Sequence, residues 1–223
     1  MLTSEVAEMV VREKIMAIIR GVARANIIDT VRALRRGGIH LVEVTLDQSR
    51  AGTHGEELDS IQMIAREFPA EVIPGAGTVL TPAQASLAIE AGARYIVSPD
   101  VNPHVIRETR KLGALSIPGA FTPTEIASAV SAGADFVKLF PAGQLGCEYV
   151  KAIRAPLSHV RLLAVGGVDL GNMKDFLRAG VVGFGIGGSL VDKKIVARGD
   201  FDEIEARSRA FVSVIRAWVA AAD

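Results

Sequence analysis

The stretch Phe136-Val137-Lys138-Leu139-Phe140-Pro141 places one lysine inside a short apolar run. Strong β-formers flank Lys138 and Pro141 ends the run, so the pattern predicts a buried strand. Because burial penalises the charged ammonium, we expect the pKa of Lys138 to fall and a neutral, nucleophilic amine to become populated. Such an amine can form a Schiff base with a carbonyl compound. A lysine paired with a buried carboxylate for structural reasons would give the same local pattern.

Composition sets limits on the class of protein. The chain has 223 residues, of which 49% are hydrophobic and only 5% aromatic, and its 25 basic side chains balance 25 acidic ones. This length suits one large domain, and abundant aliphatic residues with glycine are typical of a buried parallel sheet covered by helices. A net charge of zero provides no basic field for nucleic acid or an anionic membrane, so we expect neither as a partner.

The single cysteine and the N-terminal segment bear on the compartment. Cys147 is the only cysteine, which excludes an internal disulfide and favours a reducing, cytoplasmic environment. Residues 1–14 mix charged and apolar residues at helical spacing and lack the apolar centre of a signal peptide. No apolar run is long enough to cross a bilayer.

Short apolar runs alternate with helical patterns along the whole chain. We expect strands at 15–19, 39–46, 71–73, 95–98, 114–117, 136–141, 161–165 and 182–186, and helices at 5–14, 27–36, 55–67, 82–92, 103–112, 123–133, 146–154, from 168 to 180 and 202–220. Most helices close at a glycine, which favours the left-handed C-cap.

Strict alternation of strand and helix predicts an α/β fold with a parallel sheet, and eight units predict a (β/α)8 TIM barrel. We expect one domain over residues 1–223, with 1–14 as an extra N-terminal helix. The alternative is an open doubly wound sheet, which would place a glycine-rich nucleotide loop after the first strand. Arg20-Gly21-Val22 is not such a loop.

Alternation of side chains along two strands brings charged residues into the barrel interior. Val42, Val44 and Leu46 form an apolar face suited to packing against helices, so Glu43 faces the lumen. The same reasoning turns Lys138 inward. Arg20 follows the first strand and reaches the C-terminal rim, where active sites of these barrels lie. Clustered opposite charges at this position favour a reaction site over a structural ion pair.

Glycine pairs follow the last two strands. Gly166-Gly167 comes after the seventh strand and Gly187-Gly188-Ser189 after the eighth. Backbone N–H groups there can approach an anion closely, and these two loops are a frequent phosphate site in this architecture. The expected substrate is therefore a small phosphorylated molecule with a carbonyl group. His40, His54, His104 and His159 lack ligand spacing, so we expect no metal and no cofactor.

Together these motifs resemble the 2-dehydro-3-deoxy-6-phosphogluconate aldolase family, in order from about residue 15 to 191. This family also includes 4-hydroxy-2-oxoglutarate aldolases and 6-phosphogalactonate-type relatives. The stretches that carry the resemblance are Glu43-Val44-Thr45-Leu46, Gly75-Ala76-Gly77-Thr78-Val79-Leu80, Ser98-Pro99, Pro118-Gly119, Lys138-Leu139-Phe140-Pro141-Ala142 and Gly187-Gly188-Ser189.

The resemblance implies a class I aldolase that cleaves a 2-dehydro-3-deoxy-6-phospho sugar acid to pyruvate and glyceraldehyde 3-phosphate. It implies that Lys138 forms the imine and that Glu43 is the general acid/base, which shuttles protons through water. Thr78 would hold the pyruvyl carboxylate, while Pro99 and Phe140 would shape the pocket. It also implies phosphate binding by Gly166, Gly167, Gly187, Gly188 and Ser189, and a homotrimer.

One position departs from the family pattern. Many members carry an arginine four residues after the glutamate, where it binds the substrate carboxylate, and here that position is Asp47. Arg20 is the expected replacement. The departure leaves open which C4 epimer is preferred and whether 4-hydroxy-2-oxoglutarate is the substrate. Two rival hypotheses are a phosphate-binding isomerase or synthase with an electrostatic Lys138, and a non-catalytic barrel that senses a phosphorylated metabolite.

Overall fold

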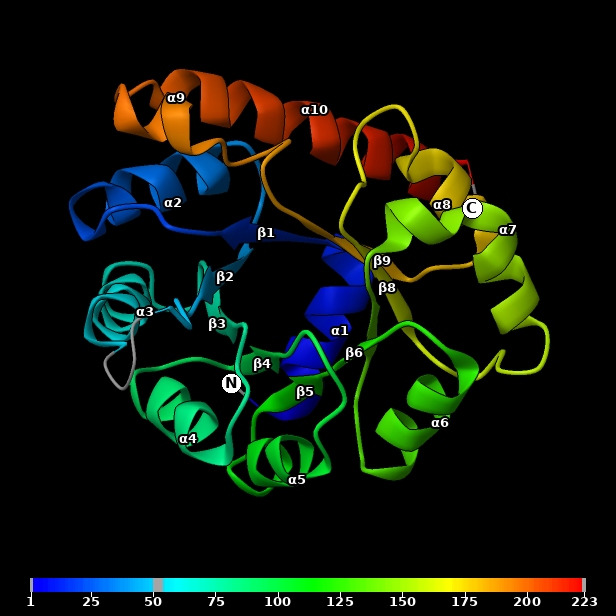
Figure 1. Ribbon diagram of the computed structural model, residues 1–223. Coiled ribbons are helices and arrows are strands. Elements are labelled where there is room, and N and C mark those ends of the chain that lie inside the picture. The colour runs from blue at the N-terminus through cyan, green and yellow to red at the C-terminus, as the bar shows by residue number, and fades with distance from the viewer. Residues whose placement is uncertain (1, 50–53, 222–223) are drawn as a thin grey trace.

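The computed structural model describes residues 2–49 and 54–221 and shows a ring of parallel strands surrounded by helices (Figure 1). The described strands are β1 (Ile15–Ile19), β2 (Leu41–Thr45), β3 (Ile73–Gly77), β4 (Tyr95–Val97), β5 (Leu115–Ile117), β6 (Gly119–Ala120), β7 (Val137–Leu139), β8 (Leu162–Val165) and β9 (Gly183–Ile186). The described helices are α1 (Thr3–Glu13), α2 (Ile27–Arg36), α3 (Gly55–Glu67), α4 (Pro82–Glu90), α5 (Pro103–Lys111), α6 (Pro123–Ser131), α7 (Ala142–Arg154), α8 (Met173–Ala179), α9 (Lys193–Ala197) and α10 (Phe201–Ala220), with a 3-10 turn η1 (Arg24–Asn26).

The order of the strands closes the barrel. Every pairing is parallel, and the sheet runs β5-β4-β3-β2-β1-β9-β8-β7-β6. Its two ends, β5 and β6, are consecutive pieces of one segment separated only by Pro118. The predicted (β/α)8 barrel is therefore confirmed. The expectation that the fifth strand stops at Pro118 is wrong, because Gly119 and Ala120 continue the segment and pair with β7.

The third strand lies later in the sequence than predicted. The expected bounds are 71–73, but β3 runs from Ile73 to Gly77 and pairs with β2 along its whole length. Glycines inside a strand mark close approach of another group. Here a Cβ atom at Gly75 would overlap the Tyr95 ring, and one at Gly77 would overlap the Glu43 carboxylate.

Three other boundaries differ from the expectations. Helix α7 begins at Ala142, not near 146, because two helical pieces meet at Gly146, whose φ is 75°. Helix α8 begins at Met173, after a turn in which Asp169 accepts hydrogen bonds from the backbone of residues 171 and 172. The short α9 was not predicted. It begins where Asp192 accepts a hydrogen bond from the backbone of Lys194.

Side chains divide between an outer core and an inner core, as the alternation predicted. Val42, Val44 and Leu46 join the large apolar cluster between strands and helices, whereas Leu41 joins a smaller cluster inside the barrel. The same smaller cluster includes Tyr95, Phe136 and Leu163.

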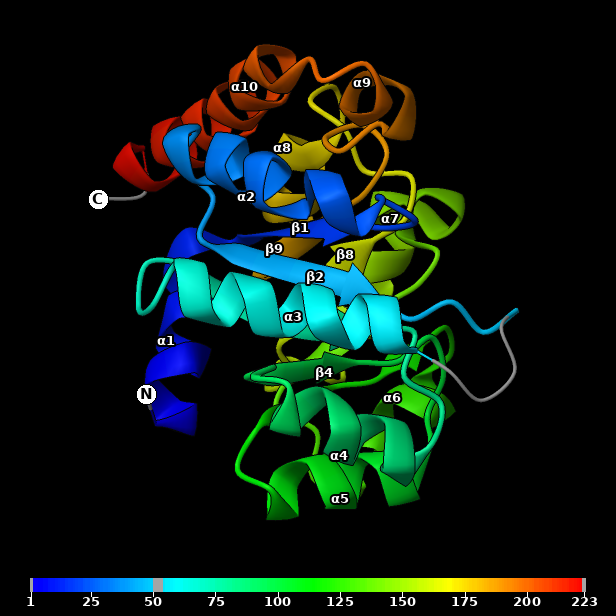
Figure 2. The same cartoon turned by 90° about the vertical axis from the view of Figure 1, so that its left-hand side faces the viewer.

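Helix α1 covers the N-terminal end of the barrel (Figures 1 and 2). Its Val6 and Val10 are 1% exposed and pack into the lumenal cluster against residues such as Met16. This end is therefore sealed by apolar packing, which leaves the C-terminal rim for the site. Among residues 2–49 and 54–221, no helix is long and apolar enough to cross a membrane.

Phe136 gives a test of the inner core. Its side chain is 1% exposed in the lumen, so Phe136→Ala should lower the free energy of unfolding by about 3–5 kcal/mol through lost burial and a cavity. The measurement is chemical denaturation at fixed protein concentration. Leu112→Ala, at a side chain that is 40% exposed, is the control and should change stability far less. Equal losses in both variants would contradict a tightly packed lumen.

Candidate active site

Lys138 and Glu43 lie inside the barrel on β7 and β2. Lys138 is 5% exposed and Glu43 is 2% exposed, so both charged groups are almost removed from water. Strand alternation positions them, since their neighbours Val137, Leu139, Val42 and Val44 pack outward. Both predicted charges therefore face the lumen.

Burial changes the proton affinity of both groups. Desolvation lowers the pKa of Lys138, and the charge of Arg20 lowers it further, while the carboxylate of Glu43 acts in the opposite direction. Desolvation raises the pKa of Glu43, against the lowering effect of the charges on Lys138 and Arg20. Both shifts favour the neutral forms, a free amine and a protonated acid, which are the forms that amine addition to a carbonyl requires.

Arg20 and Thr78 meet at the rim. The Arg20 Nη2 atom donates a hydrogen bond to Thr78 Oγ1 at 3.3 Å, which joins the end of β1 to the end of β3. Thr78 adopts a φ of 58°, a strained value for a β-branched residue that is typical of functional positions. Gln48 holds this conformation by donating from Nε2 to the Thr78 carbonyl oxygen at 2.7 Å.

A cavity of about 630 Å³ lies above Lys138. The Lys138 Nζ atom is 4.7 Å from the centre of the Phe140 ring, which is 38% exposed at the wall. Glu43 is not among the residues that line the cavity, although the charges of Lys138 and Arg20, which do line it, act on its carboxylate. The predicted site residues that line it are Arg20, Thr78, Pro99, Lys138, Phe140, Gly166, Gly167, Gly187, Gly188 and Ser189.

Glycines form one side of this cavity. Gly166 and Gly167 have φ values of 83° and 75°, a left-handed conformation that other residues rarely adopt. Gly187 and Gly188 face open space, since a Cβ atom on either would meet nothing within 4 Å. Ser189 Oγ donates to the Val168 carbonyl oxygen at 3.2 Å, which ties the two loops together. This arrangement exposes backbone groups of both loops to a ligand.

Sequence reasoning missed Gly77, which lies beneath the carboxylate of Glu43. A Cβ atom there would overlap Oε1, so the glycine creates the space that the acid occupies. Its partner in register is Thr45 of β2, two residues after Glu43. The sequence shows the Gly75-Ala76-Gly77 spacing, but nothing in that segment itself indicates that a carboxylate from β2 lies over it.

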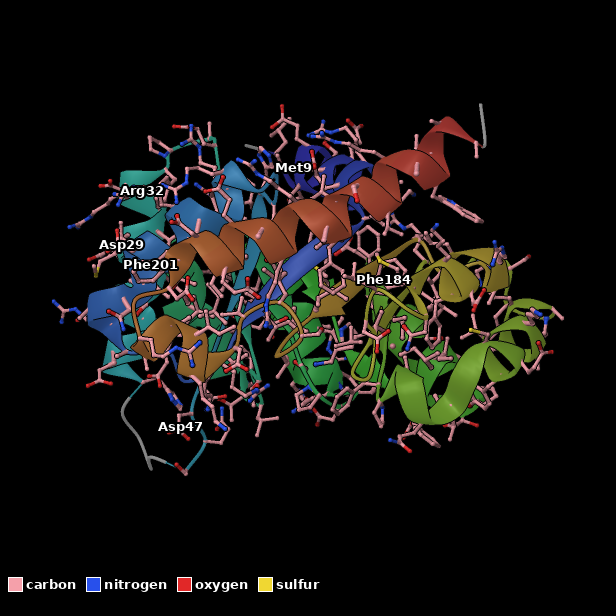
Figure 3. All side chains as sticks on the ribbon, turned by 90° about the horizontal axis from the view of Figure 1, so that it is seen from above. Met9, Asp29, Arg32, Asp47, Phe184 and Phe201 are labelled. Atoms are coloured by element: carbon pink, nitrogen blue, oxygen red, sulfur yellow. The ribbon has the colours of Figure 1, made fainter. Side chains whose placement is uncertain are left out.

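Asp47 lies outside the cavity above Lys138. It lines a neighbouring cavity of about 610 Å³ that shares Arg20 and Thr78 with the first. Its Oδ1 atom accepts hydrogen bonds from the backbone N–H and the hydroxyl of Ser49 at 3.0 and 2.7 Å. Figure 3 shows Asp47 at the rim end of the molecule, opposite Met9 of α1.

A buried lysine and a buried acid beneath a glycine-lined cavity of a (β/α)8 barrel define the class of Schiff-base-forming enzymes. A family model described as "KDPG and KHG aldolase" matches residues 6–207. The chain therefore belongs to this aldolase family, which confirms the resemblance, and it is a lyase. Among the described residues, no group of three or more His, Cys, Asp or Glu side chains is arranged to hold a metal.

Individual relatives agree with this assignment. A Rhizobium meliloti protein named a probable 2-dehydro-3-deoxy-6-phosphogalactonate aldolase is 39% identical, covering 79% of this chain and 81% of its own. The 2-dehydro-3-deoxy-phosphogluconate aldolase of Treponema pallidum is 37% identical over 82% and 85%. The structure of KDPG aldolase from Legionella pneumophila, with pyruvate captured as a covalent carbinolamine, superimposes with a TM-score of 0.82 at 25% identity, covering 92% and 96%.

A substitution at Gly77 tests whether the Glu43 carboxylate needs its present position. Gly77→Ala should displace the Glu43 carboxylate, and a misplacement of about 1 Å should lower aldol-cleavage turnover about 100-fold. Gly55→Ala, where an added Cβ meets nothing within 4 Å, is the matched control and should retain turnover. Full activity of the Gly77 variant with an intact fold would show that the carboxylate does not need this position.

Proposed function

We propose that this enzyme reversibly cleaves a 2-dehydro-3-deoxy-6-phospho sugar acid to pyruvate and glyceraldehyde 3-phosphate through an imine on Lys138. The observation that carries the proposal is the near-complete burial of the Lys138 amine at the base of the cavity, in the electric field of Glu43. The Legionella pneumophila relative, captured with pyruvate as a carbinolamine, supports it.

Imine formation begins with the neutral amine. The Lys138 Nζ lone pair attacks the C2 carbonyl of the 2-oxo acid and gives a carbinolamine. Glu43, whose pKa is raised by burial, donates a proton through water to the departing hydroxyl group, and that group leaves as water. The product is an iminium ion, and Glu43 is then a carboxylate, which the positive iminium stabilises in the dry lumen.

Cleavage uses the same acid in its basic form. Through water, the Glu43 carboxylate accepts the proton of the C4 hydroxyl, the C3–C4 bond breaks, and the electron pair of that bond moves into the iminium. The products are the aldehyde and an enamine, so no free carbanion forms. Glu43 returns the proton to C3 of the enamine. Water then hydrolyses the resulting iminium to pyruvate and the free amine of Lys138, and the Glu43 carboxylate takes up the proton that this hydrolysis releases.

The remaining cavity residues divide into three roles. Arg20 and Thr78, joined by a hydrogen bond, bind the carboxylate of the 2-oxo acid from the rim. Pro99 and Phe140 form the walls beside the reacting carbon atoms. The phosphate lies against the glycine loops, and its ligands are the backbone N–H groups and hydroxyl of Gly166, Gly167, Gly187, Gly188 and Ser189.

The substrate has two candidate configurations at C4. The gluconate-type acid is the first choice, and the 39% identity to a named phosphogalactonate aldolase favours the galactonate epimer as the alternative. The family name also includes KHG, that is, 4-hydroxy-2-oxoglutarate. Many family members bind the substrate carboxylate with an arginine at the position of Asp47. Asp47 lies outside the cavity above Lys138, whereas Arg20 lines it, so Arg20 binds the carboxylate of each of these acids.

We also propose that residues 1–223 act as one domain, that the protein is a cytoplasmic homotrimer, and that it needs no cofactor. The family resemblance supports the trimer, and exposed apolar side chains such as Leu87 and Phe121 are available for contacts between subunits. The single cysteine supports the compartment.

Borohydride trapping tests the imine. With pyruvate, borohydride should fix a pyruvyl adduct on Lys138 and leave the exposed Lys151 unmodified, as read by peptide mass spectrometry. Because burial lowers the pKa of Lys138, the trapping rate should level off below the ordinary lysine pKa of about 10.4. Glu43→Gln removes a charge that raises this pKa, so the midpoint should move to lower pH. An unmodified Lys138 would contradict the mechanism.

A coupled assay of pyruvate release tests the substrate. We expect the phosphorylated acids of both C4 configurations to be cleaved faster than 4-hydroxy-2-oxoglutarate, because only they place a phosphate against the glycine loops. Glu43→Gln should slow turnover of every substrate by roughly 10²–10⁴, the usual contribution of a positioned acid–base group. No pyruvate from any member of the panel would favour a binding protein instead.

A further inference from the structure

Tyr95 is a buried lumenal tyrosine to which the proposed reaction assigns no role. Its side chain is 0% exposed. Its hydroxyl and Glu43 Oε1 are both buried polar atoms without a hydrogen-bond partner among the described residues. An unpartnered buried polar group is costly, so two of them in one lumen point to a shared function.

The sheet register brings these two side chains together. Glu43 pairs with Gly75, and Ala76 pairs with Ile96, so Glu43, Gly75 and Tyr95 form one row across β2, β3 and β4. Neighbouring strands are about 4.8 Å apart, so the row spans about 10 Å between its outer Cα atoms. The residue in the middle has no side chain to separate the other two.

The glycines show where the two side chains end. A Cβ atom at Gly75 would overlap Cδ2, Cε2 and Cζ of Tyr95, so the phenol end of the ring lies over β3 and points toward β2. A Cβ atom at Gly77 would overlap Oε1 of Glu43, so the carboxylate also lies over β3. Both unpartnered oxygens therefore occupy the lumenal face of the same glycine strand.

We propose that Tyr95 is a positioning residue that donates a hydrogen bond to Glu43 Oε1 through a buried water and fixes the carboxylate for proton transfer. The proposal rests on the proposed function of Glu43. A water at this place has the phenol as donor and the carboxylate as acceptor, which is the polar surrounding that buried waters require.

The charged groups around Tyr95 and Glu43 determine whether loss of the Tyr95 hydroxyl raises or lowers the pKa of Glu43. The titratable and charged groups that face Glu43 are Lys138 from β7, Arg20 from the end of β1 and Tyr95 from β4. Burial, together with the charge of Glu43, raises the pKa of Tyr95 well above its ordinary value, so the phenol keeps its proton. A donor favours the ionised carboxylate, so its loss raises the pKa of Glu43.

Tyr95→Phe tests this role, because phenylalanine keeps the ring over Gly75 and removes only the hydroxyl. The acid limb of the kcat/KM profile should move up by about one pH unit, and kcat should fall roughly tenfold. Infrared titration of the Glu43 carboxyl band, assigned by its loss in Glu43→Gln, should show the same upward shift. Borohydride trapping at Lys138 should persist.

Two controls separate this role from a structural one. Tyr149→Phe removes the hydroxyl of the only other tyrosine, which donates to the Phe121 carbonyl oxygen outside the lumen, and should leave the profile unchanged. In a Glu43→Gln background, Tyr95→Phe should cause no further shift in the acid limb of the kcat/KM profile. An unmoved Glu43 titration, or a pH shift that persists without Glu43, would overturn the proposal. Absence of trapping in the unmodified enzyme would instead contradict the imine, while the infrared titration would still decide the role of Tyr95.

Discussion

The dry environment shared by Lys138 and Glu43 is the constraint on which the rest of the structure depends. Each group alone would be expensive to bury as an ion, and the barrel lumen places both out of water. The cost appears as two pKa shifts in opposite directions, downward for Lys138 and upward for Glu43, each of which favours the neutral form. The fold thus maintains a reactive pair that a solvent-exposed surface would convert into an ordinary salt bridge.

Space for this pair comes from a strand with little side-chain volume. In β3, Gly75 and Gly77 leave the lumenal face open, so residues from β2 and β4 extend over it. At the top of the same strand, Thr78 turns into its left-handed conformation and receives the hydrogen bond from Arg20. One strand therefore provides the floor for the acid and the anchor for the rim arginine.

Local periodicity was sufficient to predict the barrel and the inward direction of Glu43 and Lys138, because alternation of side chains depends only on the strand itself. It was insufficient for β3. The need for glycine at positions 75 and 77 arises from side chains on two other strands, and in the sequence the same residues are typical of a turn. Likewise, neither the Arg20–Thr78 contact nor the separation of Asp47 from the cavity has a signal within its own segment.

The apolar seal that α1 forms has a kinetic consequence for the proposed reaction. Val6 and Val10 close the far end of the lumen, and the residues that line the cavity above Lys138 lie at the rim, so we expect ligands to exchange on the rim side. In the proposed reaction the pyruvyl fragment is tethered to the buried Lys138, and the phosphorylated aldehyde leaves toward the glycine loops on the rim side. The aldehyde must depart before the tether is hydrolysed, so product release is ordered, and in the synthetic direction the enzyme loads pyruvate first.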